Sequence, residues 1–280
     1  MASDPVPSEP PPEGTRRRLR LRYPASCAVC RINLSRGSEA IWDSATKEVT
    51  CLACGTDEAP FDSGMPGASA SAEADRRRDY RVERARRQYG DHAAAVAEDV
   101  AEREIAASWR KGSAGESKLA AYIAREVGDT VLALHDRVIP GTKGNIDHIY
   151  VASTGIWVVD SKSYQGRVAK REVGPLWRRD NEVFVGGRNR TRLAKGVEWQ
   201  VDAVIAALRP DPDLKGVEVN AALCFVDSEW GLLDSPFQVG NVWVLYPAAL
   251  KKRLKKSGRL PVERRRRIAR RLDLSLPSRS

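Results

Sequence analysis

Residues 144–166 read GNIDHIYVASTGIWVVDSKSYQG, and this stretch decides the fold of the chain. It contains two apolar runs of strand length joined by Ser-Thr-Gly at 153–155. A short connection of turn-forming residues between two such runs predicts a β-hairpin. Charged residues stand at the ends of both runs: Asp147 opens the first, and Asp160 and Lys162 close the second. Buried strands do not carry charges at these positions without a reason.

Strand alternation brings these charges together. Residues i and i+2 of a strand project from one face, so Asp160 and Lys162 lie side by side. Pairing of the two strands through the short turn places Asp147 near them. Two carboxylates and an ammonium group at one point suit a site for Mg²⁺ or Mn²⁺, with the lysine steering or deprotonating an attacking water. The alternative is a weak surface ion pair between Asp160 and Lys162, with Asp147 as a turn residue.

The sequence around the hairpin predicts an α/β or α+β domain with a mixed central sheet. A helix precedes the hairpin, and strands and a second helix follow it. The expected helices cover 114–127 and 196–208, the further strands cover 131–134, 217–226 and 242–246, and a second hairpin falls in 176–191.

The order of the motifs resembles the nuclease-related domain family, a branch of the PD-(D/E)xK restriction-endonuclease-like superfamily. The motifs are a helical Glu in Gly-Ser-Ala-Gly-Glu, then Ile-Asp-His, then Gly-Ile-Trp-Val-Val-Asp-Ser-Lys, followed by Tyr-Gln-Gly-Arg. The resemblance covers about residues 112–208. It implies an αβββαβ core in which acids on the second and third strands bind metal.

The resemblance also implies roles for single residues. Asp147 corresponds to the first metal-binding acid, Asp160 to the second, and Lys162 to the catalytic lysine. Glu116 matches an additional ligand on the first helix. Gln200 matches a glutamine that contacts the site or the nucleic-acid backbone. These five residues are the predicted catalytic set, and Glu116, Asp147 and Asp160 are the predicted ligands of Mg²⁺ or Mn²⁺.

Three positions leave alternatives open. Ser113-x-x-Glu116 is also a capping box, in which the glutamate starts the helix instead of binding metal. Many relatives have Glu at the position of Asp160, and the shorter side chain moves the carboxylate by about one methylene. Asn145 stands where relatives often have an acid or Gln.

The cysteine spacing predicts a second metal site near the N-terminus. Cys27 and Cys30 form one CxxC pair, and Cys51 and Cys54 form another twenty residues later. Two such pairs can bind Zn²⁺ tetrahedrally, and a segment this small needs a metal because it buries little apolar surface. Paired redox cysteines are the alternative. The segment resembles a zinc ribbon, a module that occurs in nucleic-acid-handling proteins and in protein docking.

Charge points to a polyanionic partner. The 280-residue chain has a formal net charge of +10, and the segment from Lys251 to Arg271 holds twelve basic residues against one acid, Glu263. Such a run favours nucleic acid, with DNA as the expected partner, although a solvated charge run is the alternative. Trp199 shares a helix with an apolar face and is expected in the core.

The organisation along the chain follows from composition. The expected parts are a basic, Pro-rich N-terminus (1–22), the zinc ribbon (23–58), a flexible linker (59–72), a charged helix interrupted at Gly90 (73–110), the nuclease-like domain (111–250) and a basic C-terminal tail (251–280). The start of the chain lacks the apolar core of a secretory signal, and no apolar run reaches the length of a membrane span. These features predict a cytoplasmic protein without a membrane partner.

Together these features favour a metal-dependent nuclease that hydrolyses phosphodiester bonds in nucleic acid, with DNA as the expected substrate. The alternative is a non-catalytic module on a nuclease-like scaffold. Such a module binds nucleic acid, or docks a protein partner through the zinc ribbon.

Overall fold

The chain divides into two compact units in a computed structural model. The structure describes residues 16–28, 32–44, 46–55, 61–109, 113–175, 180–231 and 234–279. One unit holds residues 1–59 with 210–213, and the other holds residues 60–209 with 214–280. In the described parts of the chain, no helix combines the length and the apolar character that a membrane crossing requires.

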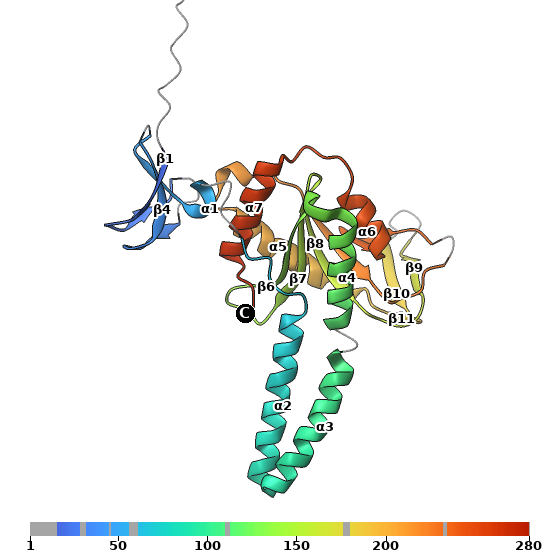
Figure 1. Cartoon of the computed structure of the whole chain (residues 1–280). Helices are drawn as coiled ribbons and strands as arrows, with labels where there is room; N and C mark the ends of the chain where they lie inside the picture. The colour runs from blue at the N-terminus through green and yellow to red at the C-terminus, as the bar shows by residue number, and fades with distance from the viewer. Residues whose placement is uncertain are drawn as a thin grey trace, which may run out of the picture. The chain divides into compact units, whose positions relative to one another are not determined.

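The N-terminal unit is built from short antiparallel strands (Figure 1). One sheet has the order β1-β4-β5, and a separate pair is formed by β2 and β3. The bounds are β1 (Arg16–Arg20), β2 (Ala25–Ser26), β3 (Asn33–Leu34), β4 (Glu39–Asp43), β5 (Glu48–Cys51) and α1 (Leu52–Gly55). Cys27 and Cys51 form a small buried cluster. The other buried apolar residues in the described part of the unit are Leu21, Ala40 and Ile41, so little apolar surface holds this unit together.

The described residues of the second unit form a mixed six-stranded sheet of order β13-β14-β12-β8-β7-β6. β6, β7 and β8 are antiparallel neighbours, β12 lies parallel to β8 and β14, and β13 closes the edge antiparallel to β14. The bounds are β6 (Leu132–Val138), β7 (Asn145–Ala152), β8 (Gly155–Lys162), β12 (Val219–Phe225), β13 (Phe237–Val239) and β14 (Val242–Leu245).

Helices cover both faces of this sheet (Figure 1). Apolar side chains of α4 (Ser113–Val127) and α6 (Pro247–Leu254) pack on one face, and those of α5 (Arg192–Leu208) and α7 (Val262–Ser275) pack on the other. The order α4-β6-β7-β8-α5-β12 is the predicted αβββαβ core, so the expected fold class is confirmed. The predicted hairpin is confirmed as well, with Ala152 paired to Gly155 across its turn.

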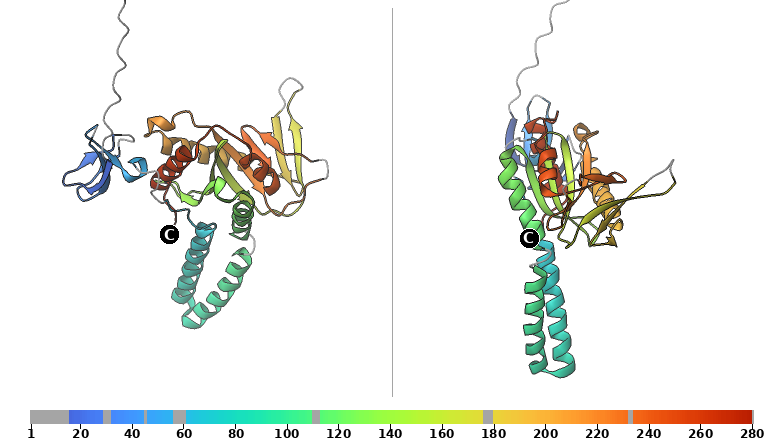
Figure 2. Two further views of the ribbon diagram at one scale, coloured as in Figure 1. Left: turned by 45° about the horizontal axis from the view of Figure 1, so that its top comes forward. Right: turned by 90° about the vertical axis from the view of Figure 1, so that its right-hand side faces the viewer.

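A second small sheet is inserted between β8 and α5. It has the order β11-β10-β9, all antiparallel, and Figure 2 shows β9 and β10 extending away from the main sheet. The remaining bounds are β9 (Val168–Val173), β10 (Asp180–Val185), β11 (Arg188–Asn189), η1 (Gly128–Thr130), η2 (Pro212–Leu214), α2 (Ala68–Tyr89) and α3 (Asp91–Trp109).

The predicted charged helix is a helical hairpin. α2 and α3 lie side by side and meet at Gly90, where the sequence predicted an interruption (Figures 1 and 2). The linker expected at 59–72 also takes a defined path in its described part. Gly64 packs against the backbone carbonyl of His135. The backbone N–H of His135 donates to the Ser63 carbonyl. The helix α2 already begins at Ala68. Backbone contacts to β6 therefore fix a segment whose composition suggested a flexible chain.

The C-terminal basic run is part of the core, which corrects its interpretation as a tail. The predicted breaks at Gly258 and Pro261 are present, but α7 buries Ile268, Ala269 and Leu272 in the main hydrophobic cluster. Apolar residues at i, i+1 and i+4 make one face of the helix, and most of the remaining positions are arginines. The second unit therefore extends to the end of the described chain.

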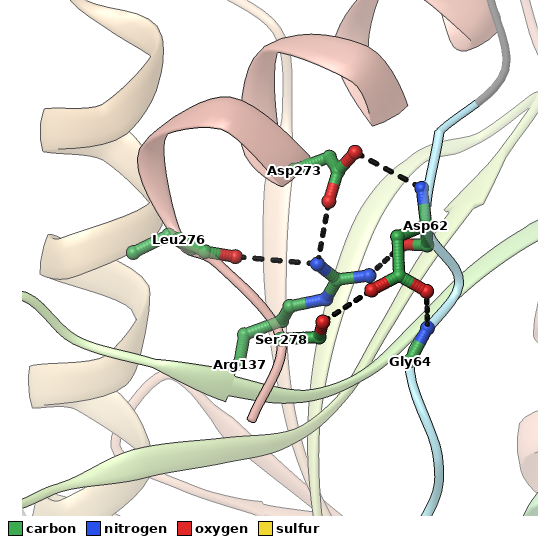
Figure 3. A network of polar contacts seen from close by, with 6 residues as sticks. All are labelled: Asp62, Gly64, Arg137, Asp273, Leu276 and Ser278. Carbon is green, nitrogen blue, oxygen red and sulfur yellow. Dashed lines mark hydrogen bonds and ion pairs between the residues drawn. The ribbon is translucent and has the colours of Figure 1, made fainter. Parts of the chain in front are cut away.

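Arg137 of β6 connects three distant segments (Figure 3). Its side chain is fully buried, and it donates to the Asp273 carboxylate at 2.8 Å and to the carbonyls of Leu276 and Asp62. Asp62 in turn accepts from the Ser278 hydroxyl and the Gly64 N–H. The guanidinium thus fastens the end of α7 and the segment before α2 to the edge strand.

Loss of this guanidinium should cost much more stability than loss of an exposed one. Arg137→Ala leaves the Asp273 carboxylate without its buried partner, and we expect a loss of about 3–5 kcal/mol. Arg167→Ala is the matched control, since Arg167 pairs with Asp234 while 62% of its side chain is exposed, and it should cost about 0–1 kcal/mol. Urea denaturation measures both. Equal losses would show that the buried network does not hold these segments.

Candidate active site

The β7–β8 hairpin places the two predicted acids directly opposite each other. His148 pairs with Val159 in the register, so the next cross-strand position joins Asp147 to Asp160. Both residues are buried, at 7% exposure each, and their carboxyl groups are close enough to share a hydrogen bond. Opposed like charges are unfavourable in a sheet. The pKa of Asp147 is raised well above its ordinary value. Burial is the largest cause, and the negative charge of Asp160 is the second.

Lys162 supplies the positive charge of the cluster. Its ammonium group donates to Asp160 Oδ1 at 2.7 Å, and three quarters of the side chain is buried. Burial by itself lowers the pKa of Lys162, but the charges of Asp160 and Asp147 outweigh it and raise the pKa above the ordinary value. The lysine therefore stays protonated. The ion pair between Lys162 and Asp160 is largely buried. It is therefore not the weak surface ion pair that the sequence left open as an alternative.

Glu116 comes to the same place from the first turn of α4. Burial, followed by the charge of Asp136, raises the pKa of its carboxyl from 4.5 to about 7, while the charge of Lys162 lowers it. The Gly67 N–H bonds to the carboxylate, and its Oε2 is buried without a hydrogen-bond partner among the described residues. The carboxyl group thus lies within reach of the charges of Asp160 and Lys162.

A glycine lets α4 approach the end of β8. A Cβ on Gly115 would lie 3.0 Å from the Cβ of Ser163, the residue after the lysine. Ser163 donates its hydroxyl to Asp227, and the ammonium of Lys118 bonds to the same carboxylate at 3.1 Å. The glycine in the Gly-Glu motif therefore brings Glu116 toward the strand that carries the second acid.

Asp136 is a site residue that the sequence reasoning missed. In the pairing of β6 with β7, His135 pairs with His148 and Arg137 pairs with Ile146. Asp136 is the residue between these two pairs on β6, so it lies opposite Asp147 on β7. It is fully buried with a left-handed φ of 49°. Aspartate tolerates this conformation better than most residues. Two sequence features could have identified Asp136: the tolerance of aspartate for this conformation and its place inside an apolar strand.

The carboxylate of Asp136 connects the helical hairpin to the site. It accepts from the backbone N–H and the hydroxyl of Ser69, in the first turn of α2, and from Asn145 Nδ2 at 2.9 Å. A carboxylate at this end of a helix meets unpaired N–H groups and the positive end of the helix dipole. Its charge also acts on Glu116. Asn145, which departs from the family pattern, thus has a structural partner.

Gln200 supports the start of β7. It is buried on α5, and its Nε2 donates to the Asn145 carbonyl at 3.3 Å, two residues before Asp147. This places Gln200 as a positioning residue. Its neighbour Trp199 is not in the core as expected. Its side chain is 44% exposed, and its ring lies against Gly144, because the apolar face of α5 passes through other positions.

The acids of the site carry the kind of ligand atom that a divalent cation prefers, but among the described residues only Cys27, Cys51 and Cys54 bring three candidate ligand atoms within 4.8 Å of one another. Glu116, Asp147 and Asp160 offer carboxylate oxygens, the ligands that Mg²⁺ and Mn²⁺ prefer. The Asp147 and Asp160 carboxylates repel each other, and Glu116 Oε2 is a buried acceptor without a hydrogen-bond partner among the described residues. A cation relieves both penalties.

A separate cluster of thiols lies in the N-terminal unit. The Sγ atoms of Cys27, Cys51 and Cys54 lie within 4.8 Å of one another. The Cys51 N–H also donates to the Cys27 sulfur at 3.3 Å. Cys30, the fourth predicted ligand, lies outside the described residues. No disulfide joins the described cysteines, which is compatible with metal binding and does not favour a redox pair.

Fold and site together define a class. A mixed sheet between helices, with opposed acids on adjacent antiparallel strands and a lysine two residues beyond the second acid, is the nuclease-like arrangement that the sequence motifs implied. Residues 111–226 match the family model of the nuclease-related domain. This part of the chain is therefore similar to the nuclease-related domain.

Other comparisons are sparse. An uncharacterized protein of Bacillus anthracis is 27% identical over 124 residues, which is 40% of this chain and 58% of that protein. The match thus spans a little more than half of that relative's length. No solved structure matches the chain.

The raised pKa of Glu116 predicts a pH dependence of stability. Between about pH 4.5 and 7 the unfolded carboxyl is ionised while the folded one keeps its proton, so the free energy of unfolding falls as pH rises through this window. In EDTA, Glu116→Gln should lose less stability across the window and be the more stable protein above pH 7. Thermal melts at stepped pH measure this.

Glu98→Gln is the control, because Glu98 is exposed on α3, and it should follow the wild type. A Glu116→Gln melting curve that falls as steeply as the wild type from pH 4.5 to 7 would contradict the assigned burial of this carboxyl.

Proposed function

We propose that this protein is a metal-dependent nuclease that hydrolyses phosphodiester bonds, with DNA as substrate. The observation that carries the proposal is the opposition of Asp147 and Asp160 on β7 and β8, with the ammonium group of Lys162 on the second carboxylate. The match to the nuclease-related domain supports it. The cost of burying opposed acids is hard to explain by folding alone, since such pairs destabilise a sheet.

The three acids would have different roles in binding a cation. Asp147 and Asp160 would supply the principal ligands, and Glu116 would supply an oxygen directly or through water. Asp160 is shorter than the glutamate of many relatives, but it lies within hydrogen-bonding reach of Asp147, so the two can share one ion. When bound, Mg²⁺ or Mn²⁺ lowers the pKa of a water and offsets charge on the phosphate.

Lys162 acts as a fixed positive charge in this proposal. Its raised pKa opposes a role as general base. The ammonium group can instead donate hydrogen bonds to the scissile phosphate or orient the attacking water. Gln200 holds the Asn145 carbonyl and so fixes the start of the strand from which Asp147 projects.

The inserted sheet offers basic contacts near the site. Arg190, which follows β11, places its guanidinium 4.7 Å above the ring of Tyr164, two residues beyond Lys162. Lys170, Arg171 and Arg188 are exposed on the same small sheet. Side chains of this kind bind the phosphate backbone and make affinity fall with salt. We assign the substrate contacts next to the acids to this insertion.

Cleavage assays test the proposal. The full-length protein should cut at least one nucleic acid in a panel of single- and double-stranded DNA and RNA with Mg²⁺ or Mn²⁺, and EDTA should abolish cutting. Asp160→Asn and Lys162→Ala should each lower the rate at least about a hundredfold, as expected for lost transition-state charge stabilisation. Glu98→Gln and Arg84→Ala change exposed residues of the helical hairpin formed by α2 and α3 and should retain cleavage.

Two results would contradict the proposed nuclease function. One is no cutting of any nucleic acid in the panel by well-folded protein. The other is cutting that survives both site substitutions. Binding that weakens with salt but persists in Asp160→Asn, without cleavage, would instead favour the non-catalytic nucleic-acid-binding module.

We also propose that the four paired cysteines bind Zn²⁺ and that the N-terminal unit needs this metal to fold. The convergence of Cys27, Cys51 and Cys54 supports it, with Cys30 as the expected fourth ligand. A unit with so small a buried centre gains its stability from the metal.

Purified protein should contain one zinc ion per chain by elemental analysis. Cys51→Ser should lose it, because the hydroxyl is a poor substitute for a thiolate ligand. Cys224→Ala should keep it, since Cys224 is buried in β12 of the other unit. Zinc retained at full stoichiometry in Cys51→Ser would rule out this site.

A further inference from the structure

A cavity lies at the opposite end of the main sheet from the acids. It has a volume of about 800 Å³ and is bordered by the β7–β8 turn, the start of β12 and the loop between α6 and α7. β8 runs the full distance between the cavity at Gly155 and the site at Lys162, and eight strand residues span about 23 Å. The two places are therefore separate.

The cavity is strongly basic. Among the described residues that line it, Arg253, Lys256, Arg259 and Arg264 face a single acid, Glu218. Lys256, Arg259 and Arg264 are exposed, and the guanidinium of Arg253 stacks on the ring of Trp243 at 4.0 Å. An excess of positive charge around a cavity attracts anions.

Backbone contacts hold the loop that carries two of these residues. The Leu260 N–H donates to the Ser153 carbonyl at 3.0 Å, and the Ser153 hydroxyl donates to the Lys256 carbonyl at 2.9 Å. A Cβ on Gly258 would lie 2.0 Å from the same Ser153 carbonyl oxygen, so only glycine permits this approach. The loop is thus fixed against the β7–β8 turn, which lowers the entropy cost of binding a ligand there.

An unpaired donor lines the cavity between two indoles. Asn220 of β12 has a buried Nδ2 without a hydrogen-bond partner among the described residues. Trp157 is its register partner on β8, and Trp243 pairs with Ala222, two residues further along the same face of β12. A buried amide without an acceptor is unfavourable by about 1–3 kcal/mol. A ligand with acceptor oxygens satisfies it.

We propose that this cavity binds a phosphate-bearing ligand, either a free nucleotide or the backbone of a nucleic acid. Arginine and lysine donate charge-assisted hydrogen bonds to phosphate oxygens, and arginine does so in a bidentate manner. The Asn220 amide can donate to a further acceptor oxygen of the same ligand. The proposal is independent of whether the acids at the other end of the sheet cut nucleic acid.

Binding is measured by calorimetry in EDTA with two probes, ATP and a short DNA duplex. The double variant Lys256→Ala/Arg259→Ala should weaken the binding of at least one probe about tenfold or more. Asn220→Asp, which keeps the side-chain shape and adds a negative charge, should weaken the same probe. Arg84→Ala/Arg87→Ala removes the same charge from exposed positions of α2 and is the matched control.

The two probes distinguish the sources of phosphate. Weakened ATP binding identifies a nucleotide site, and weakened duplex binding with ATP unaffected identifies a backbone contact. Unchanged binding of both probes by both cavity variants would overturn the proposal. So would equal weakening by the control, which would indicate a general charge effect. Melting curves of all variants show that they fold, and Asn220→Asp gives a readout that does not depend on the loop.

Discussion

The site depends on one constraint, the register of the β7–β8 hairpin. A two-residue turn at Ser153 and Thr154 pairs Ala152 with Gly155, and every later pair follows from it. A slip of one residue would turn each side chain to the other face of the sheet. In the observed register Asp147 meets Asp160, and the apolar residues between the turn and the acids are buried on both faces. The core that fixes the register therefore also fixes the distance between the acids.

The edge strand β6 ties the rest of the unit to this hairpin through two consecutive buried charges. Asp136 binds the start of α2, and Arg137 binds the end of α7 and the segment before α2. The left-handed conformation of Asp136 allows neighbouring residues to point to different partners. Asp136 also acts on Glu116 through its charge. The helical hairpin, the C-terminal helix and the acid cluster are thus linked at one position of the sheet.

Positive charge is distributed differently from what the linear sequence indicates. The basic run at the C-terminus holds an excess as large as that of the whole chain, but α7 uses its apolar face for the core and buries Arg270 and Arg271. The loop between α6 and α7 carries other basic residues to the end of the sheet away from the acids. Close to the acids, the guanidinium of Arg190, which follows the inserted sheet, lies over the ring of Tyr164.

The sequence by itself determined the αβββαβ order, the hairpin, the strand-end acids with their lysine, and the spacing of the cysteines. These features depend on local periodicity, turn composition and short motifs, which act within a few residues along the chain. Only the tertiary structure decided the place of α7, the exposure of Trp199, the role of Gln200 behind Asn145, and the presence of Asp136 beside the site. Each of these depends on contacts between residues far apart in the sequence, where packing outweighs local propensity.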